Sequence, residues 1–205
     1  RRINRIMMEK VDDAWQGAST LFLYTKELRS GGVRIAMDPS GKSIYYASTA
    51  RGWQRPDEGL QRITYHGKTP FHVKDFKLST SGFRIWFTKA IKDPQKLAEK
   101  ISVRSFQFEY GYRYGSSEKD KKEHRILKVS GNGSFEIHID GLEAGRIFEL
   151  EFSPKVLSIK GESIKEPRVQ YTLNRLKRPD SIHPVSLIES DDGIEVRIAG
   201  KFLAK

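Results

Sequence analysis

Cysteine is absent from this 205-residue chain, and its absence excludes three kinds of chemistry. Without a thiol the chain has no disulfide, no zinc–thiolate centre and no cysteine nucleophile. Long apolar runs are absent too, since no stretch approaches the 18 apolar residues of a membrane-spanning helix. We therefore expect no membrane span.

Short motifs of common catalytic sites are also missing. No Gly-x-Ser-x-Gly occurs, which removes the nucleophile elbow of serine hydrolases. Histidines are never spaced as His-x-x-x-His, the pattern of a helical metal site. We expect surface or hydrogen-bonded structural roles for all five of them, which are His66, His72, His124, His138 and His183. No catalytic, cofactor-binding or metal-binding residue is expected in this chain.

Positive charge is abundant and uneven. The formal net charge is +11, and residues 61–178 hold 24 Lys and Arg against 14 Asp and Glu, which is +10. Such an excess attracts polyanions, so a polyanion-binding basic domain is one alternative function. Acidic residues are interspersed throughout, however, and the charged run at 119–125 is typical of a solvated loop. No helix-turn-helix or zinc-finger pattern occurs, so sequence-specific nucleic-acid binding is not expected.

Short alternating strands and turn residues predict an all-β chain. Residues 3–11 read as a strand and residues 15–18 as a loop. Asp38-Pro39-Ser40-Gly41 has type I turn chemistry and lies between strands at 33–37 and 44–47, with a third strand from Gly59. This is most of one β-propeller blade, and such a blade needs neighbouring blades to bury its faces.

From residue 73 the pattern predicts an immunoglobulin-like β-sandwich of about seven strands, without the Cys-Trp-Cys core of antibody domains. A short helix is expected at 95–100, with Asp93 as N-cap and Pro94 at the first helical position. The predicted division is a partial terminal β-propeller blade at 1–66, the sandwich at 67–178, and a linker or the start of a further element at 179–205.

Exposed aromatic residues are the candidate ligand-binding groups. Trp53 and Arg55 lie in a loop near the end of the predicted blade, where loops commonly bind ligands. Phe106, Phe108, Tyr110, Tyr112 and Tyr114 share one strand parity, which predicts a face packed into the sandwich core. Tyr112 and Tyr114 are the most distal of them, and with Arg113 they are the candidates for stacking on sugar rings.

Several of these segments resemble a known family. Trp15-Gln16-Gly17-Ala18, Gly32-Val33-Arg34, Asp38-Pro39-Ser40-Gly41, Arg51-Gly52-Trp53 and Gly59-Leu60-Gln61-Arg62 resemble the last blade of glucose/sorbosone dehydrogenase-like β-propellers. Residues 66–174 look like the sandwich that follows this propeller in large proteins of planctomycete-type bacteria. The matching pieces there include Gly67-Lys68-Thr69-Pro70-Phe71 and Tyr171-Thr172-Leu173-Asn174.

The resemblance implies quinone-dependent oxidation of sugars or related alcohols by a parent protein in the periplasm or cell exterior. It implies pyrroloquinoline quinone and calcium as cofactors of that parent, held by blades outside this chain. The expected function here is a non-catalytic, C-terminal structural and docking region whose partners are the missing blades of the same polypeptide. A carbohydrate-binding module that uses Trp53, Tyr112 and Tyr114 is the other alternative.

Overall fold

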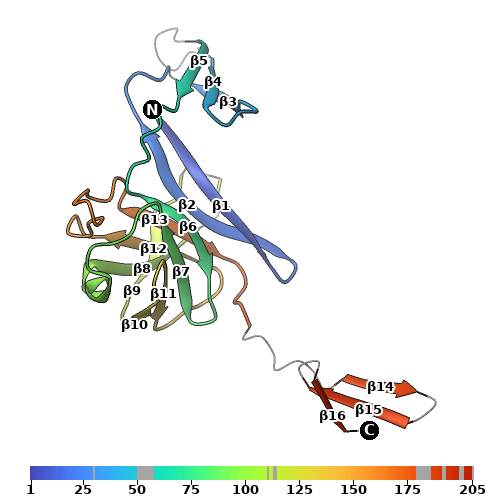
Figure 1. Cartoon of the computed structure of the whole chain (residues 1–205). Helices are drawn as coiled ribbons and strands as arrows, with labels where there is room; N and C mark the ends of the chain where they lie inside the picture. Colours follow the sequence, from blue (N-terminus) through green and yellow to red (C-terminus); the bar gives the residue numbers. More distant parts are fainter. Residues whose placement is uncertain are drawn as a thin grey trace.

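Antiparallel β-strands make up nearly all the regular structure of the computed structural model (Figure 1). The structure describes residues 1–29, 31–49, 58–109, 111–112 and 115–178, and the backbone of three strands between residues 186 and 204. In these residues the helical segments are two 3-10 turns, η1 (Pro94–Lys96) and η2 (Ala98–Lys100). No helix of the described part is long and apolar enough to cross a bilayer. The predicted all-β class is confirmed.

Two antiparallel sheets pack face to face as a sandwich (Figure 1). The larger sheet has six strands in the order β1 (Arg2–Val11), β2 (Ala14–Tyr24), β13 (Arg168–Leu173), β12 (Arg146–Phe152), β8 (Ile101–Phe108) and β9 (Glu118–His124). The smaller has four strands in the order β10 (Ile126–Ser130), β11 (Ser134–Ile139), β7 (Gly82–Phe87) and β6 (Val73–Leu78).

Alternating side chains of the two sheets meet in one core. Phe83 and Ile85 of β7 face Phe148 and Leu150 of β12, and all four are fully buried. The Phe83 ring centroid lies 5.6 Å from that of Phe148 and 5.3 Å from that of Tyr171. The one-face alternation that the sequence predicts for β7 and β12 is therefore confirmed, because every second residue of a strand points to the same side.

The hairpin β1–β2 is part of this sandwich. β2 pairs with β13, and the side chains of Met7, Val11 and Ala18 join the common core. The sequence grouped residues 1–66 in one blade, whereas the structure places residues 2–24 in the six-stranded sheet. Residues 15–18, expected as a loop, lie inside β2. The cause is a pairing between segments about 150 residues apart, which a local pattern does not reveal.

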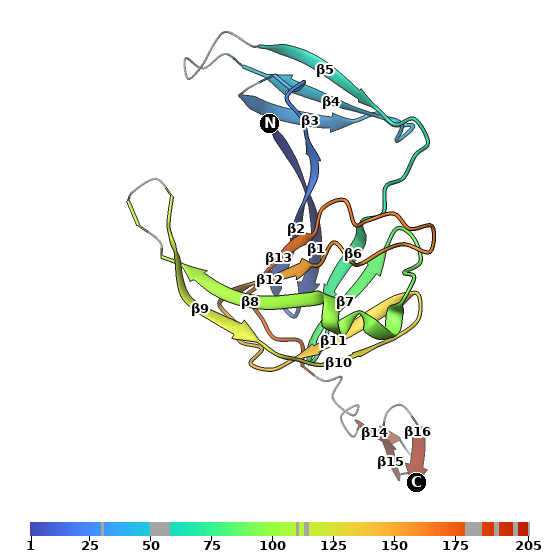
Figure 2. The ribbon, with the colours of Figure 1, turned by 90° about the vertical axis from the view of Figure 1, so that its left-hand side faces the viewer.

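A separate three-stranded sheet lies between the hairpin and β6 in the chain, and Figure 2 shows it standing apart from the sandwich. Its strands are β3 (Gly32–Met37), β4 (Ser43–Ser48) and β5 (Gly59–Thr64), close to the predicted positions. The Gly41 N–H donates to the Asp38 carbonyl at 2.8 Å, and Gly41 adopts φ +69°, which suits glycine. The predicted Asp-Pro-Ser-Gly turn is confirmed.

Three local predictions are corrected. The charged run at 119–125 lies mostly in β9, an edge strand, rather than in a loop. Its charges suit an edge, because charged side chains discourage pairing with other chains. The expected helix at 95–100 is two 3-10 turns, and the Asp93 side chain makes no capping bond. Near the C-terminus, β14 (Ser186–Ser190), β15 (Gly193–Ile198) and β16 (Lys201–Ala204) pair with one another, where the sequence predicted a linker or the start of a further element.

Candidate functional site

Of the predicted ligand-binding residues, Tyr112 is the one that the structure describes. It lies beyond the end of β8 and is 94% exposed. With its neighbours it lines an open depression of about 350 Å³, which Glu109, Gly111, Tyr112, Gly115, Ser116, Ser117 and Lys119 form. Trp53, Arg55, Arg113 and Tyr114 lie outside the described residues.

The aromatic residues of β8 do not fill the sandwich core, which corrects the prediction. Phe106 pairs with Ile147 on the side of the sheet that faces away from the core. Phe106 is buried there between Phe108, whose ring centroid is 5.3 Å away, and the Arg104 guanidinium, 5.0 Å above its ring. Phe108 is 53% exposed. Val103 and Ser105 are the residues of this strand that point into the core. The alternation therefore predicted correctly that Phe106 and Phe108 share one face, but that face is the outer one.

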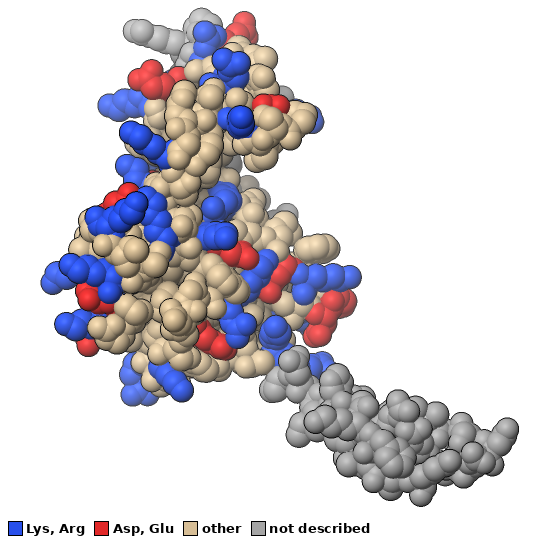
Figure 3. All heavy atoms as spheres, viewed as in Figure 1, with Lys and Arg blue, Asp and Glu red and all other residues tan. Residues whose placement is uncertain are grey.

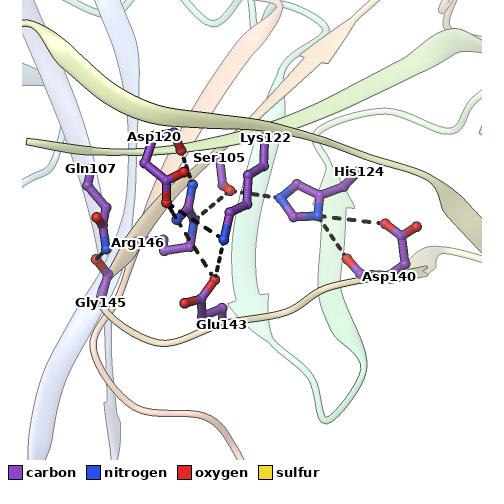
Figure 4. Close-up of polar contacts among 9 residues, drawn as sticks. All are labelled: Ser105, Gln107, Asp120, Lys122, His124, Asp140, Glu143, Gly145 and Arg146. Atoms are coloured by element: carbon purple, nitrogen blue, oxygen red, sulfur yellow. Dashed lines mark hydrogen bonds and ion pairs between the residues drawn. The ribbon is translucent and has the colours of Figure 1, made fainter.

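A buried polar network lies on the inner side of the same strands (Figure 4). Arg146 points inward from β12 and is almost fully buried. Its Nε donates to Ser105 Oγ at 2.8 Å and its Nη1 donates to Asp120 Oδ2 at 2.5 Å, while its Nη2 donates to the Asp120 carbonyl. The hydrogen bond from Arg146 lowers the pKa of the Asp120 carboxyl. Glu143 lies 3.8 Å from the guanidinium and 3.0 Å from Lys122 Nζ.

Asp120 reaches Arg146 because β9 carries an extra residue there. Ser105 pairs with Lys122, but Gln107 pairs with Lys119, so the register shifts by one residue at this point. Asp120 adopts φ +44°, a left-handed conformation that aspartate tolerates better than most residues. The bulge turns both the carboxylate and the carbonyl of this residue toward the guanidinium.

Ser105, His124 and Asp140 form a chain that resembles a nucleophile–base–acid arrangement (Figure 4). His124 Nδ1 lies 2.9 Å from the Asp140 carbonyl oxygen, which only accepts, so Nδ1 carries the proton. Nε2 then accepts from Ser105 Oγ at 2.7 Å. Ser105 has no exposed surface, so no substrate reaches its hydroxyl. The arrangement therefore satisfies buried polar groups rather than performing nucleophilic catalysis.

A second ionic cluster covers the outer side of β8. Arg104 donates from Nη1 and Nη2 to the Glu118 carboxylate at 2.7 and 3.2 Å, and from Nε to Glu149 at 2.8 Å. Gln170 Nε2 donates to the other Glu149 oxygen at 2.7 Å. The hydrogen bonds from Arg104, followed by that from Lys121, lower the pKa of Glu118 to about 2. The nearly buried Glu149 carboxylate is thus compensated on both oxygens.

Most of the histidines take the structural roles that the sequence predicts. The ring nitrogens of His72 lie 2.9 Å from the Val73 carbonyl and 3.2 Å from that of Leu21, which links β2 to β6. His138 Nδ1 lies 2.6 Å from Ser81 Oγ. Among the described residues, no three His, Asp or Glu side chains converge as a metal ion requires. His183 lies outside them.

Charges of both signs are interspersed on the face of the molecule that Figure 3 draws, where Lys and Arg side chains lie among Asp and Glu. Several Lys and Arg side chains of the described chain are paired, among them Lys89 with Glu162 at 2.6 Å and Arg84 with Glu136 at 2.9 Å. Such pairs offset part of the positive charge of residues 61–178.

Sequence reasoning missed the buried network, although one signal was present. Arg146 has the same parity in its strand as Phe148, Leu150 and Phe152, so it occupies an inward position among apolar residues. An arginine at such a position requires buried acceptors. The identity of those acceptors, on β8 and on the bulge of β9, depends on tertiary pairing.

No family model, no curated protein and no solved structure matches this chain.

Proposed function

We propose that this chain is a non-catalytic structural and docking region of a secreted, propeller-type protein similar to the glucose/sorbosone dehydrogenases. In this proposal the β3–β5 sheet is part of a terminal blade that packs against further blades of the same polypeptide. The parent holds any pyrroloquinoline quinone and calcium in its other blades, and works in the periplasm or outside the cell.

The observation that carries the proposal is the apolar surface of the β3–β5 sheet. Ile35 and Met37 of β3 are 50% and 69% exposed, and by register they share one face with Ile44 and Ile63. All residues of β3 are exposed. An apolar face of this kind is unfavourable in water, and a propeller blade covers it by stacking.

The opposite face of this sheet supports the same idea. Leu60 of β5 and Tyr45 of β4 have the opposite parity and are also exposed. In a closed propeller every blade, the last one included, has a neighbour on each side, so both of its faces carry apolar groups. A sheet that belonged to the surface of the sandwich alone would bury one face and solvate the other.

The test is self-association of the purified chain by sedimentation velocity. The unmodified chain is expected to associate with rising concentration through the β3–β5 face, and the double variant Ile35→Lys, Met37→Glu to stay monomeric. Lys128→Glu on β10 is the matched control for a charge change, and is expected to associate like the unmodified chain. A monomer at all concentrations for the unmodified chain contradicts the proposal.

A second readout addresses the absence of catalysis. Dye reduction with glucose, pyrroloquinoline quinone and calcium is expected to stay at the blank rate when this chain is the only protein present. A rate above the blank that depends on the chain would overturn the non-catalytic assignment.

A further inference from the structure

The outer face of the six-stranded sheet carries exposed aromatic residues in one transverse row. Trp15 of β2 and Phe108 of β8 both point away from the core. Thr172 of β13 pairs with Gly17 on one side and Ile147 on the other, and Ile147 pairs with Phe106. Trp15 lies two residues from Gly17 on β2, and Phe108 lies two residues from Phe106 on β8. Both lie toward the same end of the sheet, so they belong to the next row on the same face.

Hydrogen bonds beyond the last paired residues keep this row in register. Asn174 Nδ2 donates to the Trp15 carbonyl at 3.1 Å, and the Gly145 N–H donates to the Leu173 carbonyl at 2.7 Å. Gln107 Nε2 donates to the Gly145 carbonyl at 3.2 Å. The row therefore runs from Trp15 over Asn174 and Gly145 to Phe108. Three strand steps of about 4.8 Å place the two aromatic residues roughly 14 Å apart.

The floor between the two aromatic residues is low. Gly145 lies in the same row and carries no side chain, and in the adjacent row Gly17 carries none and Thr172 is short. Trp15 is 61% exposed and Phe108 about half exposed, so each rises above this floor. Two apolar platforms with small residues between them can support a flat, extended ligand that touches both.

Planar hydrogen-bonding groups lie beside the platforms. Asn174 is in the aromatic row itself, and Gln170 lies four residues back along β13 on the same face, two rows away. Both side chains are exposed. Each amide nitrogen already donates one bond within the protein, Asn174 to the Trp15 carbonyl and Gln170 to Glu149. An amide has a second N–H and an oxygen, which suit adjacent hydroxyl groups. A ligand that suits this face therefore has an apolar ring surface and hydroxyl groups along its edges.

The charges of this face balance one another. Four cations face outward here, and four carboxylates match them: Lys10, Arg104, Lys121 and Arg168 against Glu118, Glu123, Glu149 and Glu151. Arg104 is engaged by two of these carboxylates. The face therefore offers a polyanion no net attraction, which favours an uncharged ligand.

We propose that this face, with Trp15 and Phe108 as stacking platforms and Asn174 and Gln170 as hydroxyl-binding groups, binds an extended neutral polysaccharide. Pyranose rings present an apolar C–H face to an aromatic ring and direct their hydroxyls sideways, which matches both features. The site goes beyond the proposed docking function and does not depend on it, because it uses the opposite end of the hairpin and a different sheet.

Affinity electrophoresis of the full chain in gels that contain hydroxyethyl cellulose, xylan or laminarin tests the proposal. The unmodified chain is expected to be retarded by at least one of the three. Trp15→Ala and Phe108→Ala are each expected to weaken that retardation at least tenfold, and Trp15→Phe to preserve most of it. Tyr45→Ala, an exposed aromatic residue on the β3–β5 sheet, is the matched control and is expected to bind normally.

Three results would overturn the proposal. These are no retardation by any neutral polysaccharide, retardation that both alanine variants retain, and binding that is confined to heparin and disappears with salt. If Trp15→Ala fails to fold by circular dichroism, the retardation of Phe108→Ala and of Trp15→Phe decides the question. The sedimentation test of the β3–β5 face is independent, so failure of one proposal leaves the other standing.

Discussion

Arginine 104 shows how one residue organises the outer side of the large sheet. It bridges Glu118 of β9 and Glu149 of β12, and it lies over the Phe106 ring. Its guanidinium is partly exposed, so each single ion pair contributes little. The forked geometry nevertheless fixes three neighbouring strands relative to one another, which an isolated Lys–Glu contact would not do.

The depressed pKa of Glu118 predicts a loss of stability in acid. Its usual pKa is 4.5, and the bonds from Arg104 hold it at about 2 in the folded protein. A carboxyl whose pKa is lower in the folded state stabilises the fold above its unfolded pKa, and this contribution disappears as the pH falls. The melting temperature is therefore expected to fall between about pH 4.5 and pH 2 more steeply in the unmodified chain than in Glu118→Gln.

The comparison is made by thermal unfolding in a series of buffers of constant ionic strength. Glu123→Gln, two register rows away on the same strand, serves as the control and is expected to follow the unmodified chain. Identical curves for the unmodified chain and Glu118→Gln would show that the Arg104 pair does not hold in solution.

Among the elements, the hairpin β1–β2 depends on one buried glutamine. Gln16 Nε2 donates to Tyr171 Oη at 2.9 Å and to the Arg175 carbonyl at 3.1 Å. Gln16 Oε1 accepts from the N–H groups of Asn174 and Arg175 at 3.0 and 2.8 Å. Tyr171 in turn donates to Glu9 Oε1 at 2.8 Å. The glutamine thus replaces strand pairing at the point where β13 ends.

Gln16→Leu is expected to loosen this hairpin. Leucine fills a similar volume but leaves the Asn174 and Arg175 N–H groups without their acceptor, at a cost of about 2–3 kcal/mol. Urea unfolding followed by fluorescence measures the cost, and hydrogen exchange of β1 and β2 locates it. Gln107→Leu, which removes one bond at the surface, is the control and is expected to cost less than about 1 kcal/mol. Equal costs in the two variants would rule out the anchoring role.

Local sequence patterns predicted most of these strands and turns. The features that they did not predict depend on pairing between strands that are distant in the sequence. Alternation in β7 and β12 and the turn at Asp38–Gly41 are set by neighbours in sequence, so the sequence alone was sufficient. Phe106 and Phe108 were assigned to the wrong face, because a parity does not say which side is inward. The meeting of Ser105, His124 and Arg146 depends on the pairing of three strands, and Asp120 joins them through a β-bulge, so no spacing in the chain predicts it.

On the scale of the whole molecule, one core joins the N-terminal hairpin to the strands from β6 to β13. Met7, Val11 and Ala18 share it with residues from Phe71 to Leu173, while the described side chains of the β3–β5 sheet take no part in it. The small sheet is therefore an insertion between two parts of a single sandwich. Its hydrogen bonds to residues 27–29, such as Gln61 Nε2 to the Glu27 carbonyl at 2.9 Å, tie it to the end of β2.

This arrangement predicts opposite outcomes for two shortened chains. Residues 67–178 alone lack the partner of β13 and three core side chains, so they are expected to remain unfolded or to aggregate through the unpaired β13 edge. A chain that keeps residues 1–29 and 67–178, joined by a flexible Gly-Ser linker, retains the whole core and is expected to unfold cooperatively. Dispersed amide signals and a single urea transition identify the folded chain. Cooperative folding of residues 67–178 alone would contradict the shared core, because the hairpin would then contribute no necessary contact.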